Sequence, residues 1–233
     1  MKIKEILAEE AINLPELLRK NCAPFLKRVG GFEFLMEHPL WRGLTRNAGF
    51  IRMIKMFPSP ANRPPLDTGL DYHRAMDNWF FEHTGIRYRS NAFFTTGEKA
   101  QAEVYGNAYM FFPIGDFKFT WSPNVKDLTA SLRDGREDIQ NKVRDKINRG
   151  DFSYDDEGFD AFHEALEKEI KKYMLDSPWM DNFMKSLNYD LNSTSNLDYA
   201  IETGNEIMMH CDLAYLVNPE SLAIRLKYGN AFV

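Results

Sequence analysis

The stretch NAYMFFPIGDFKFTWS, at residues 107–122, constrains the fold more than any other part of the chain. Its two apolar halves lie on either side of residues 113–116, where a proline and a glycine interrupt the pattern. After this turn, Phe117, Phe119 and Trp121 alternate with polar residues, which is the two-residue period of a half-buried β-strand. The sequence therefore predicts two strands here, and the fold must contain a sheet.

Helical patterns occur on both sides of these strands. Apolar residues follow helical spacing within residues 3–36, with a break at Gly30 and Gly31, and again within residues 72–80. Residues 125–149 are charged and predicted to be helical. A clear amphipathic helix is marked by Phe159, Phe162, Leu166, Ile170 and Tyr173.

Further strands are expected at residues 40–44, at residues 86–97, and in two segments near the C-terminus, NEIMMHCDLAYLV and SLAIRLKYGNAFV. Residues 57–69 and 187–200 are predicted to be loops. The order of these elements predicts an α+β fold with a mainly antiparallel sheet. We expect an N-terminal helical segment at residues 1–37 and a second unit at residues 38–233, with a helical insertion at about 123–190.

Composition excludes several classes of function. The net charge of −5 gives the chain no general attraction to nucleic acid or to an anionic membrane. No apolar run is long enough to span a membrane, and acidic residues near the N-terminus argue against a signal peptide. Cys22 and Cys211 lie far apart, which fits a reducing compartment better than a disulfide framework. We therefore expect a cytoplasmic protein that does not bind membranes.

Common catalytic and ligand-binding motifs are absent from the sequence. It contains neither GxGxxG nor GxxxxGK[ST], so neither usual phosphate-binding loop is present. HExxH and GxSxG are also missing, and the five histidines show no metal-ligand spacing. We expect no metal site.

Three short motifs remain, each on a predicted strand. They are LWRGL at residues 40–44, FFTTG at 93–97 and GNEIMM at 204–209. In sequence order they present an arginine, a pair of threonines and a glutamate. Each is weak alone, because arginine, threonine and glutamate are common at strand ends and surfaces.

Taken together, the three motifs resemble the R-S-E class of ADP-ribosyltransferases, the bacterial toxin and phage enzymes that use NAD. In that family an arginine on the first strand is often followed by glycine, a hydroxyl motif ends the middle strand, and the catalytic glutamate begins a late strand. The resemblance covers roughly residues 38–122 and 199–233. It implies a split β-sandwich and transfer of ADP-ribose from NAD, as substrate, to a protein or nucleic-acid acceptor.

The resemblance also assigns roles to single residues. Glu206 would stabilise the oxocarbenium-like ribose as the nicotinamide bond breaks. Arg42 would bind the NAD phosphates in a two-pronged geometry, and the backbone at Gly43 would hold the nicotinamide carboxamide. Thr95 and Thr96 would order the site, and Tyr105 would cover the nicotinamide ring. The loop that recognises the acceptor would contain Tyr199, Glu202 and Gly204.

The sequence departs from the family at two of these places. Many members carry Glu or Gln two residues before the catalytic glutamate, where this chain has Gly204. A nucleic-acid acceptor, another acceptor or plain NAD hydrolysis is therefore as plausible as a protein acceptor. The middle motif is FTTG, and a literal Ser193-Thr194-Ser195 sits instead in a polar segment shortly before Glu206.

Two other functions stay open. A non-catalytic phage or host inhibitor could keep the fold without turnover, and an RNA phosphotransferase could use a related fold. Arg46, Arg52 and Arg89 are rivals of Arg42 for phosphate binding. The expected location is the cytoplasm, or the host cytoplasm if the protein is a toxin or a phage effector.

Overall fold

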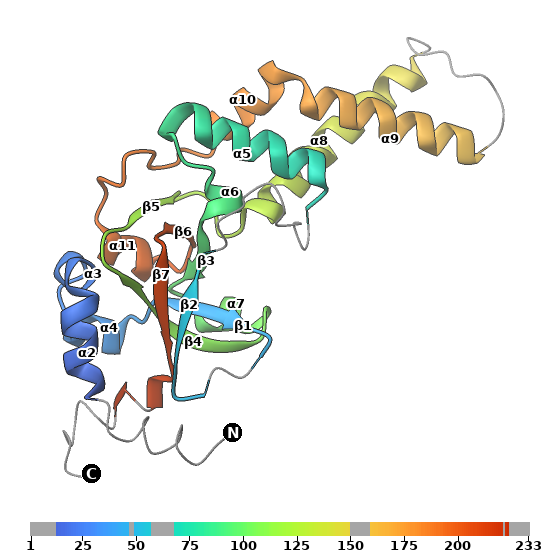
Figure 1. The fold of residues 1–233 in the computed structure, drawn as a ribbon. Coiled ribbons are helices and arrows are strands. Elements are labelled where there is room, and N and C mark those ends of the chain that lie inside the picture. Colours follow the sequence, from blue (N-terminus) through green and yellow to red (C-terminus); the bar gives the residue numbers. More distant parts are fainter. Residues whose placement is uncertain (1–12, 47–48, 57–67, 150–158, 221, 224–233) are drawn as a thin grey trace.

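The computed structural model describes residues 13–46, 49–56, 68–149, 159–220 and 222–223 (Figure 1). The strands are β1 (Trp41–Leu44), β2 (Ile51–Lys55), β3 (Phe93–Thr96), β4 (Asn107–Ile114), β5 (Lys118–Trp121), β6 (Glu206–His210) and β7 (Leu213–Val217). The helices are α2 (Leu14–Asn21), α3 (Ala23–Arg28), α4 (Phe32–Glu37), α5 (Leu70–Thr84), α6 (Tyr88–Asn91), α7 (Lys99–Glu103), α8 (Leu128–Asn148), α9 (Phe159–Leu175), α10 (Ser177–Ser186) and α11 (Leu197–Glu202).

The described strands form a seven-stranded sheet in the order β2-β7-β4-β1-β3-β6-β5. Every pair is antiparallel, so the prediction of an α+β fold with an antiparallel sheet is confirmed. Both strands expected at residues 107–122 form. They are not neighbours, because β4 lies between β7 and β1 whereas β5 forms an edge beside β6.

Helices pack against the sheet in two groups (Figure 1). The N-terminal helices α2 to α4 lie over the β4–β7 region, where Phe25 meets Phe112 edge to face at a ring separation of 6.0 Å. At the other end, α5 and α8 to α10 bury a second apolar cluster that includes Met76, Leu166 and Met208. The helices α8 and α9 run side by side away from the sheet.

A polar loop covers the outer edge of β5. The Ser193 hydroxyl accepts a hydrogen bond from the backbone N–H of Phe119, and the Asp190 carbonyl accepts one from the Thr120 hydroxyl. The Ser195 hydroxyl accepts from the indole N–H of Trp121 at 2.7 Å. The Phe119 N–H, and the Trp121 carbonyl that accepts from the Asp190 N–H at 2.9 Å, are backbone groups that an edge strand would otherwise expose. The literal Ser-Thr-Ser sequence therefore has a structural use at this edge.

Five segments differ from the sequence prediction. Residues 88–91 form α6, because the Asp77 carboxylate of α5 accepts hydrogen bonds from its backbone. Residues 197–202 form α11, because Leu197, Ala200 and Ile201 are buried at helical spacing. NEIMMHCDLAYLV holds two strands, β6 and β7, and β2 was not predicted. Of the last predicted strand, Leu222 and Ala223 are helical and most of the rest lies outside the described residues.

No helix in the described ranges is long and apolar enough to cross a membrane.

Two glycines allow helices to approach the strands that carry the motifs. A Cβ atom at Gly97 would overlap the backbone carbonyl of Ile201 in α11, and one at Gly43 would overlap the carbonyl of Ala102 in α7. Because no larger residue fits, both positions require glycine for backbone packing. Gly43 is therefore explained by its contact with α7.

Replacing Gly97 with alanine should lower the free energy of unfolding by about 3 kcal/mol, because α11 would have to move off β3. Gly69→Ala is the control: its Cβ would meet only the Tyr72 side chain, at 3.3 Å, so it should lose less than about 1 kcal/mol. Urea titration measures both. Equal losses in the two variants would contradict the packing of α11 described above.

Candidate functional site

The register of the sheet brings the three motif strands together. Strand β3 pairs with β1 on one side and with β6 on the other, and Thr96 lies opposite both Trp41 and Glu206. Residues directly opposite one another across antiparallel strands point to the same face. Trp41, Thr96 and Glu206 therefore share a face, and the threonine motif does adjoin the glutamate.

Arg42 lies on the opposite face of the sheet. It follows Trp41 on the strand, and successive side chains alternate. Its guanidinium lies over the ring of Phe93, 5.2 Å from the centroid, and donates a hydrogen bond to the carbonyl of Phe94 at 2.8 Å. Arg42 and Glu206 are thus on nearby strands, but their side chains leave the sheet in opposite directions.

Both threonines use their hydroxyls on the backbone. Thr95 donates to the carbonyl of Ile207 at 2.8 Å, and Thr96 donates to the carbonyl of Gly204 at 2.7 Å. The Thr96 hydroxyl also accepts from the N–H of Glu98 at 3.0 Å. These bonds fix the turn that leads into β6, and so they fix the position of Glu206.

The Glu206 side chain is 12% exposed and lies in a polar environment built from three elements. Arg89 of α6 approaches it, with 3.8 Å between Nη1 and Oε1. The segment that begins α8 holds its backbone, since the N–H of Glu206 donates to the carbonyl of Lys126 at 3.1 Å. The Arg89 guanidinium also packs on the ring of Phe94, with 4.8 Å between its Cζ atom and the ring centroid. Arg89, a rival of Arg42 by sequence, is thus the arginine beside the glutamate.

Burial raises the pKa of Glu206 from 4.5 to about 7. The Arg89 charge lowers the pKa, the Asp127 carboxylate raises it, and a backbone hydrogen bond from Leu128 lowers it. Desolvation outweighs the arginine because the pair is separated by more than hydrogen-bond distance. A carboxyl group with this pKa exists in both protonation states near neutral pH, as acid–base and charge-stabilising groups in enzymes often do.

Three buried polar atoms at this place, two of the pair itself and one of Tyr189, lack hydrogen bonds. Within the described ranges, Glu206 Oε1, Arg89 Nε and the Tyr189 hydroxyl have no hydrogen-bond partner. Burial raises the pKa of Tyr189 well above its ordinary value, with further effects from Glu206, Arg89 and Asp127. Buried unsatisfied groups are uncommon in native proteins, and they concentrate where a ligand or a reaction uses them. We define the candidate site as Glu206, Arg89, Tyr189 and Asp127.

The other predicted site residues lie around this centre. Tyr105, half-exposed after α7, donates a hydrogen bond from its hydroxyl to Asp127 at 3.4 Å. Tyr199 and Glu202 are on α11: Tyr199 is exposed and meets Trp121 edge to face, and Glu202 is 3.8 Å from the imidazole of His38. Gly204 adopts a positive φ of 71° in the turn before β6.

The sequence analysis did not identify Tyr189 or Asp127 as site residues. It named Arg89 only as a rival phosphate ligand and did not predict its contact with Glu206. Tyr189 lies in a polar segment that was predicted to be a loop, and Asp127 begins a helix that was placed outside the family resemblance. No local pattern reveals either residue, because the α8–α10 region brings them to the sheet from outside it.

No group of three or more His, Cys, Asp or Glu side chains that could hold a metal ion occurs in the described residues. Comparison of the chain with protein-family models, with curated proteins and with solved structures found no match.

The raised pKa of Glu206 predicts a pH-dependent stability. The folded state binds this proton more tightly than the unfolded chain, so the stabilising contribution is complete below pH 4.5 and is lost as the pH rises through about 7. The loss amounts to about 3 kcal/mol. Glu206→Gln lacks the titrating group and should not show this part of the decline.

Urea unfolding from below pH 4.5 to above pH 7 checks this by comparing the wild type with Glu206→Gln. Glu164→Gln, which removes an exposed carboxyl on α9, is the matched control and should keep the wild-type pH dependence. Parallel curves for all three proteins would show that Glu206 titrates as an ordinary solvated acid.

Proposed function

We propose that the protein is an NAD-dependent mono-ADP-ribosyltransferase with Glu206 as its catalytic carboxylate. The observation that carries the proposal is the run of β1, β3 and β6 as neighbouring strands, with Thr96 directly opposite Glu206. The proposal includes the finer fold assignment, a split β-sandwich of the ADP-ribosyltransferase kind. It is supported by the antiparallel sheet and by the two separate apolar clusters that cover it.

In the proposed reaction the bond between C1′ of the ribose and the nicotinamide nitrogen breaks, and nicotinamide leaves with the bonding electron pair. The acceptor then forms a bond to C1′ and loses a proton. Positive charge develops on the ribose in between, and the Glu206 carboxylate stabilises it. The ionised form is required. A bound nicotinamide cation would favour that form in a group whose pKa is near 7.

Arg89 takes the role that the family resemblance gave to Arg42. It is the arginine 3.8 Å from the carboxylate, whereas Arg42 projects from the other face of β1. A planar guanidinium in this place can bind phosphate oxygens once NAD is present. Tyr199 and Glu202 remain our proposal for acceptor contacts because both are exposed on α11, close along the chain to Glu206.

A specific observation favours a second candidate, a binding protein without turnover. Glu206 is largely covered by α6, by Tyr189 and by the start of α8, as expected for a buried group that does not contact a substrate. The two functions differ in one testable respect, namely whether the protein consumes NAD.

Incubation of the pure protein with NAD labelled on its adenylate part, with and without a cell lysate, should release nicotinamide and transfer label. Glu206→Gln should reduce the rate by at least about a hundredfold, because it keeps the shape of the side chain and removes its charge. Glu164→Gln, an exposed acid on α9, should react as the wild type. Separate analysis of protein and nucleic acid identifies the acceptor, and free ADP-ribose alone would indicate hydrolysis. A folded wild type that neither releases nicotinamide nor transfers label would favour the binding protein.

A second comparison decides between the two arginines. Arg89→Lys should raise the KM for NAD about tenfold, because lysine cannot bind phosphate with two parallel hydrogen bonds. Arg42→Lys should change KM less, since its guanidinium lies over Phe93 on the other face. The reverse order would return the phosphate site to Arg42.

A further inference from the structure

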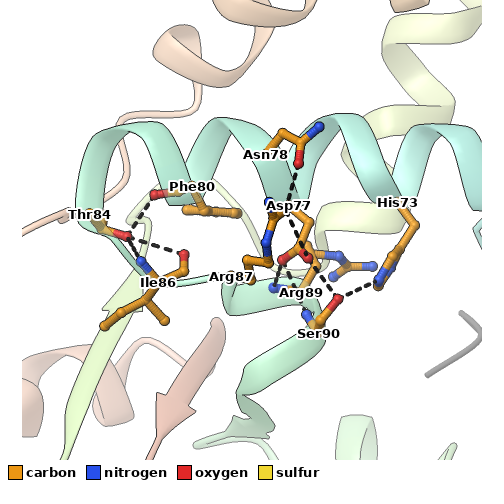
Figure 2. A network of polar contacts seen from close by, with 9 residues as sticks. All are labelled: His73, Asp77, Asn78, Phe80, Thr84, Ile86, Arg87, Arg89 and Ser90. Carbon is orange, nitrogen blue, oxygen red and sulfur yellow. Dashed lines mark hydrogen bonds and ion pairs between the residues drawn. The ribbon is translucent and has the colours of Figure 1, made fainter. Parts of the chain in front are cut away.

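A buried polar network joins α5 to α6 immediately beside Arg89 (Figure 2). Asp77 of α5 is at its centre. One carboxylate oxygen, Oδ1, accepts hydrogen bonds from the backbone N–H groups of Arg89 at 3.0 Å and Ser90 at 3.2 Å. The other, Oδ2, accepts one from the Ser90 hydroxyl at 2.7 Å. Asp77 and Ser90 are both buried, so these bonds form away from water.

This arrangement provides hydrogen-bond acceptors for the backbone N–H groups at the start of α6. A helix begins with backbone N–H groups that have no partner within it, and the first residue before α6, Arg87, provides no side-chain cap. Asp77 caps α6 from another helix, and its negative charge is favoured at a helix N-terminus. The backbone of Arg89 is thus attached directly to α5.

Two further side chains complete the network. The Ser90 hydroxyl gives its proton to Asp77, so it accepts from Nε2 of His73, which is 3.2 Å away. Arg87 places Nη1 3.9 Å from Asp77 Oδ2 and donates to the side-chain carbonyl of Asn78 at 2.5 Å. Figure 2 shows Ser90, Arg87 and the backbone of Arg89 around Asp77, with His73 next to Ser90 and Asn78 next to Arg87.

We propose that Asp77, supported by Ser90 and His73, is a positioning residue that fixes α6 so that the Arg89 guanidinium lies against Glu206. The described contacts of the Arg89 side chain are the face of Phe94 and the ion pair with Glu206. Neither contact involves a hydrogen bond, so neither fixes the guanidinium sharply. The two hydrogen bonds that Asp77 accepts from the α6 backbone, one of them from Arg89 itself, supply that constraint.

The consequence for catalysis rests on the proposed function, whereas the consequence for Glu206 itself does not. The charged and titratable groups near the Glu206 carboxylate are Arg89 from α6, Asp127 at the start of α8, and Tyr189 after α10. Arg89 is the cation among them. If α6 moves, Glu206 loses the effect that keeps its pKa from rising further, so its titration reports directly on where Arg89 lies.

The test measures this titration by carbon NMR of the Glu206 carboxyl group, assigned by comparison with Glu206→Gln. In Asp77→Ala the midpoint should rise by about one pH unit, and in Ser90→Ala and Asp77→Asn by less, because these variants keep the Oδ1 acceptor or part of the cap. Asp181→Ala is the matched control. Asp181 also anchors α5, through a hydrogen bond from the Trp79 indole at 3.0 Å, but it does not touch α6.

Asp77→Ala and Asp181→Ala should both lower the melting temperature, and only Asp77→Ala should move the titration. An unchanged midpoint in the Asp77 and Ser90 variants, or an equal shift in Asp181→Ala, would overturn the proposal. If Asp77→Ala does not fold, Ser90→Ala and Asp77→Asn decide the question by the same criteria.

The NAD assay forms a separate arm. If the wild type cleaves NAD, kcat/KM should fall about tenfold in Asp77→Ala, and the acid limb of its pH profile should move upward together with the titration of Glu206. A wild type without NAD turnover would refute the proposed enzyme, while a shifted titration would still establish Asp77 as the residue that positions Arg89. Full turnover with an unshifted titration in the Asp77 variants would refute only the positioning role.

Discussion

A carboxyl group that is almost completely covered must be compensated by its surroundings, and Glu206 is compensated only in part. Burial disfavours its charge, and a cation at 3.8 Å together with a backbone hydrogen bond from the start of α8 favours it. The balance leaves the pKa at about 7 and the Oε1 atom without a hydrogen bond in the described part of the chain. Three neighbouring elements determine this environment: β3 sets the register of Glu206, α6 places Arg89 beside it, and the turn before α8 covers it. The positions of these elements therefore determine at which pH Glu206 ionises.

The Glu206–Arg89 pair can be interpreted as a structural ion pair or as part of a ligand-binding site. As a structural ion pair it would be poor, because close hydrogen-bonded contact is what makes a buried pair favourable and this pair lacks it. As part of a site, incomplete satisfaction is useful, since a ligand can supply the missing donors and acceptors. The Tyr189 hydroxyl and Arg89 Nε, also without hydrogen bonds among the described residues, strengthen the second interpretation. This is why we favour a reactive carboxylate over a purely structural one.

Much of the fold could be predicted from periodicity, whereas the site could be predicted only in part. The strands at residues 107–122 and the late strand that begins at Glu206 have clear apolar patterns, and both are present. The pairing of Thr96 with Glu206 agrees with the order of the motifs. Arg42 shows the limit of such reasoning. Whether a side chain shares a face with Glu206 depends on register, and a shift of one residue reverses it. No pattern within LWRGL encodes the register.

Helix α6 shows a second limit. The sequence IRYRSNAFFTTG, at residues 86–97, predicts one strand, and β3 does form within its second half. Residues 88–91 are helical because Asp77 accepts hydrogen bonds from the N–H groups of Arg89 and Ser90, which are 12 and 13 residues further along the chain. A cap supplied by another helix cannot be recognised from local sequence. The local preference for a strand is overridden by a tertiary contact, and that contact is also the one that delivers Arg89 to the glutamate.

The cover over Glu206 determines how the proposed reaction would have to proceed. With 12% of its side chain exposed, Glu206 cannot meet the ribose of NAD unless Tyr189 or the segment at residues 126–128 moves aside. That segment is held by the backbone bond between Glu206 and Lys126, by a bond from the Gln101 side chain to the Lys126 carbonyl at 2.7 Å, and by the longer Tyr105–Asp127 bond at 3.4 Å. Arg89, in contrast, is tied to α5 through Asp77. In the proposed reaction, binding of NAD would therefore have to break contacts of the start of α8 or displace Tyr189, while Asp77 keeps Arg89 in place.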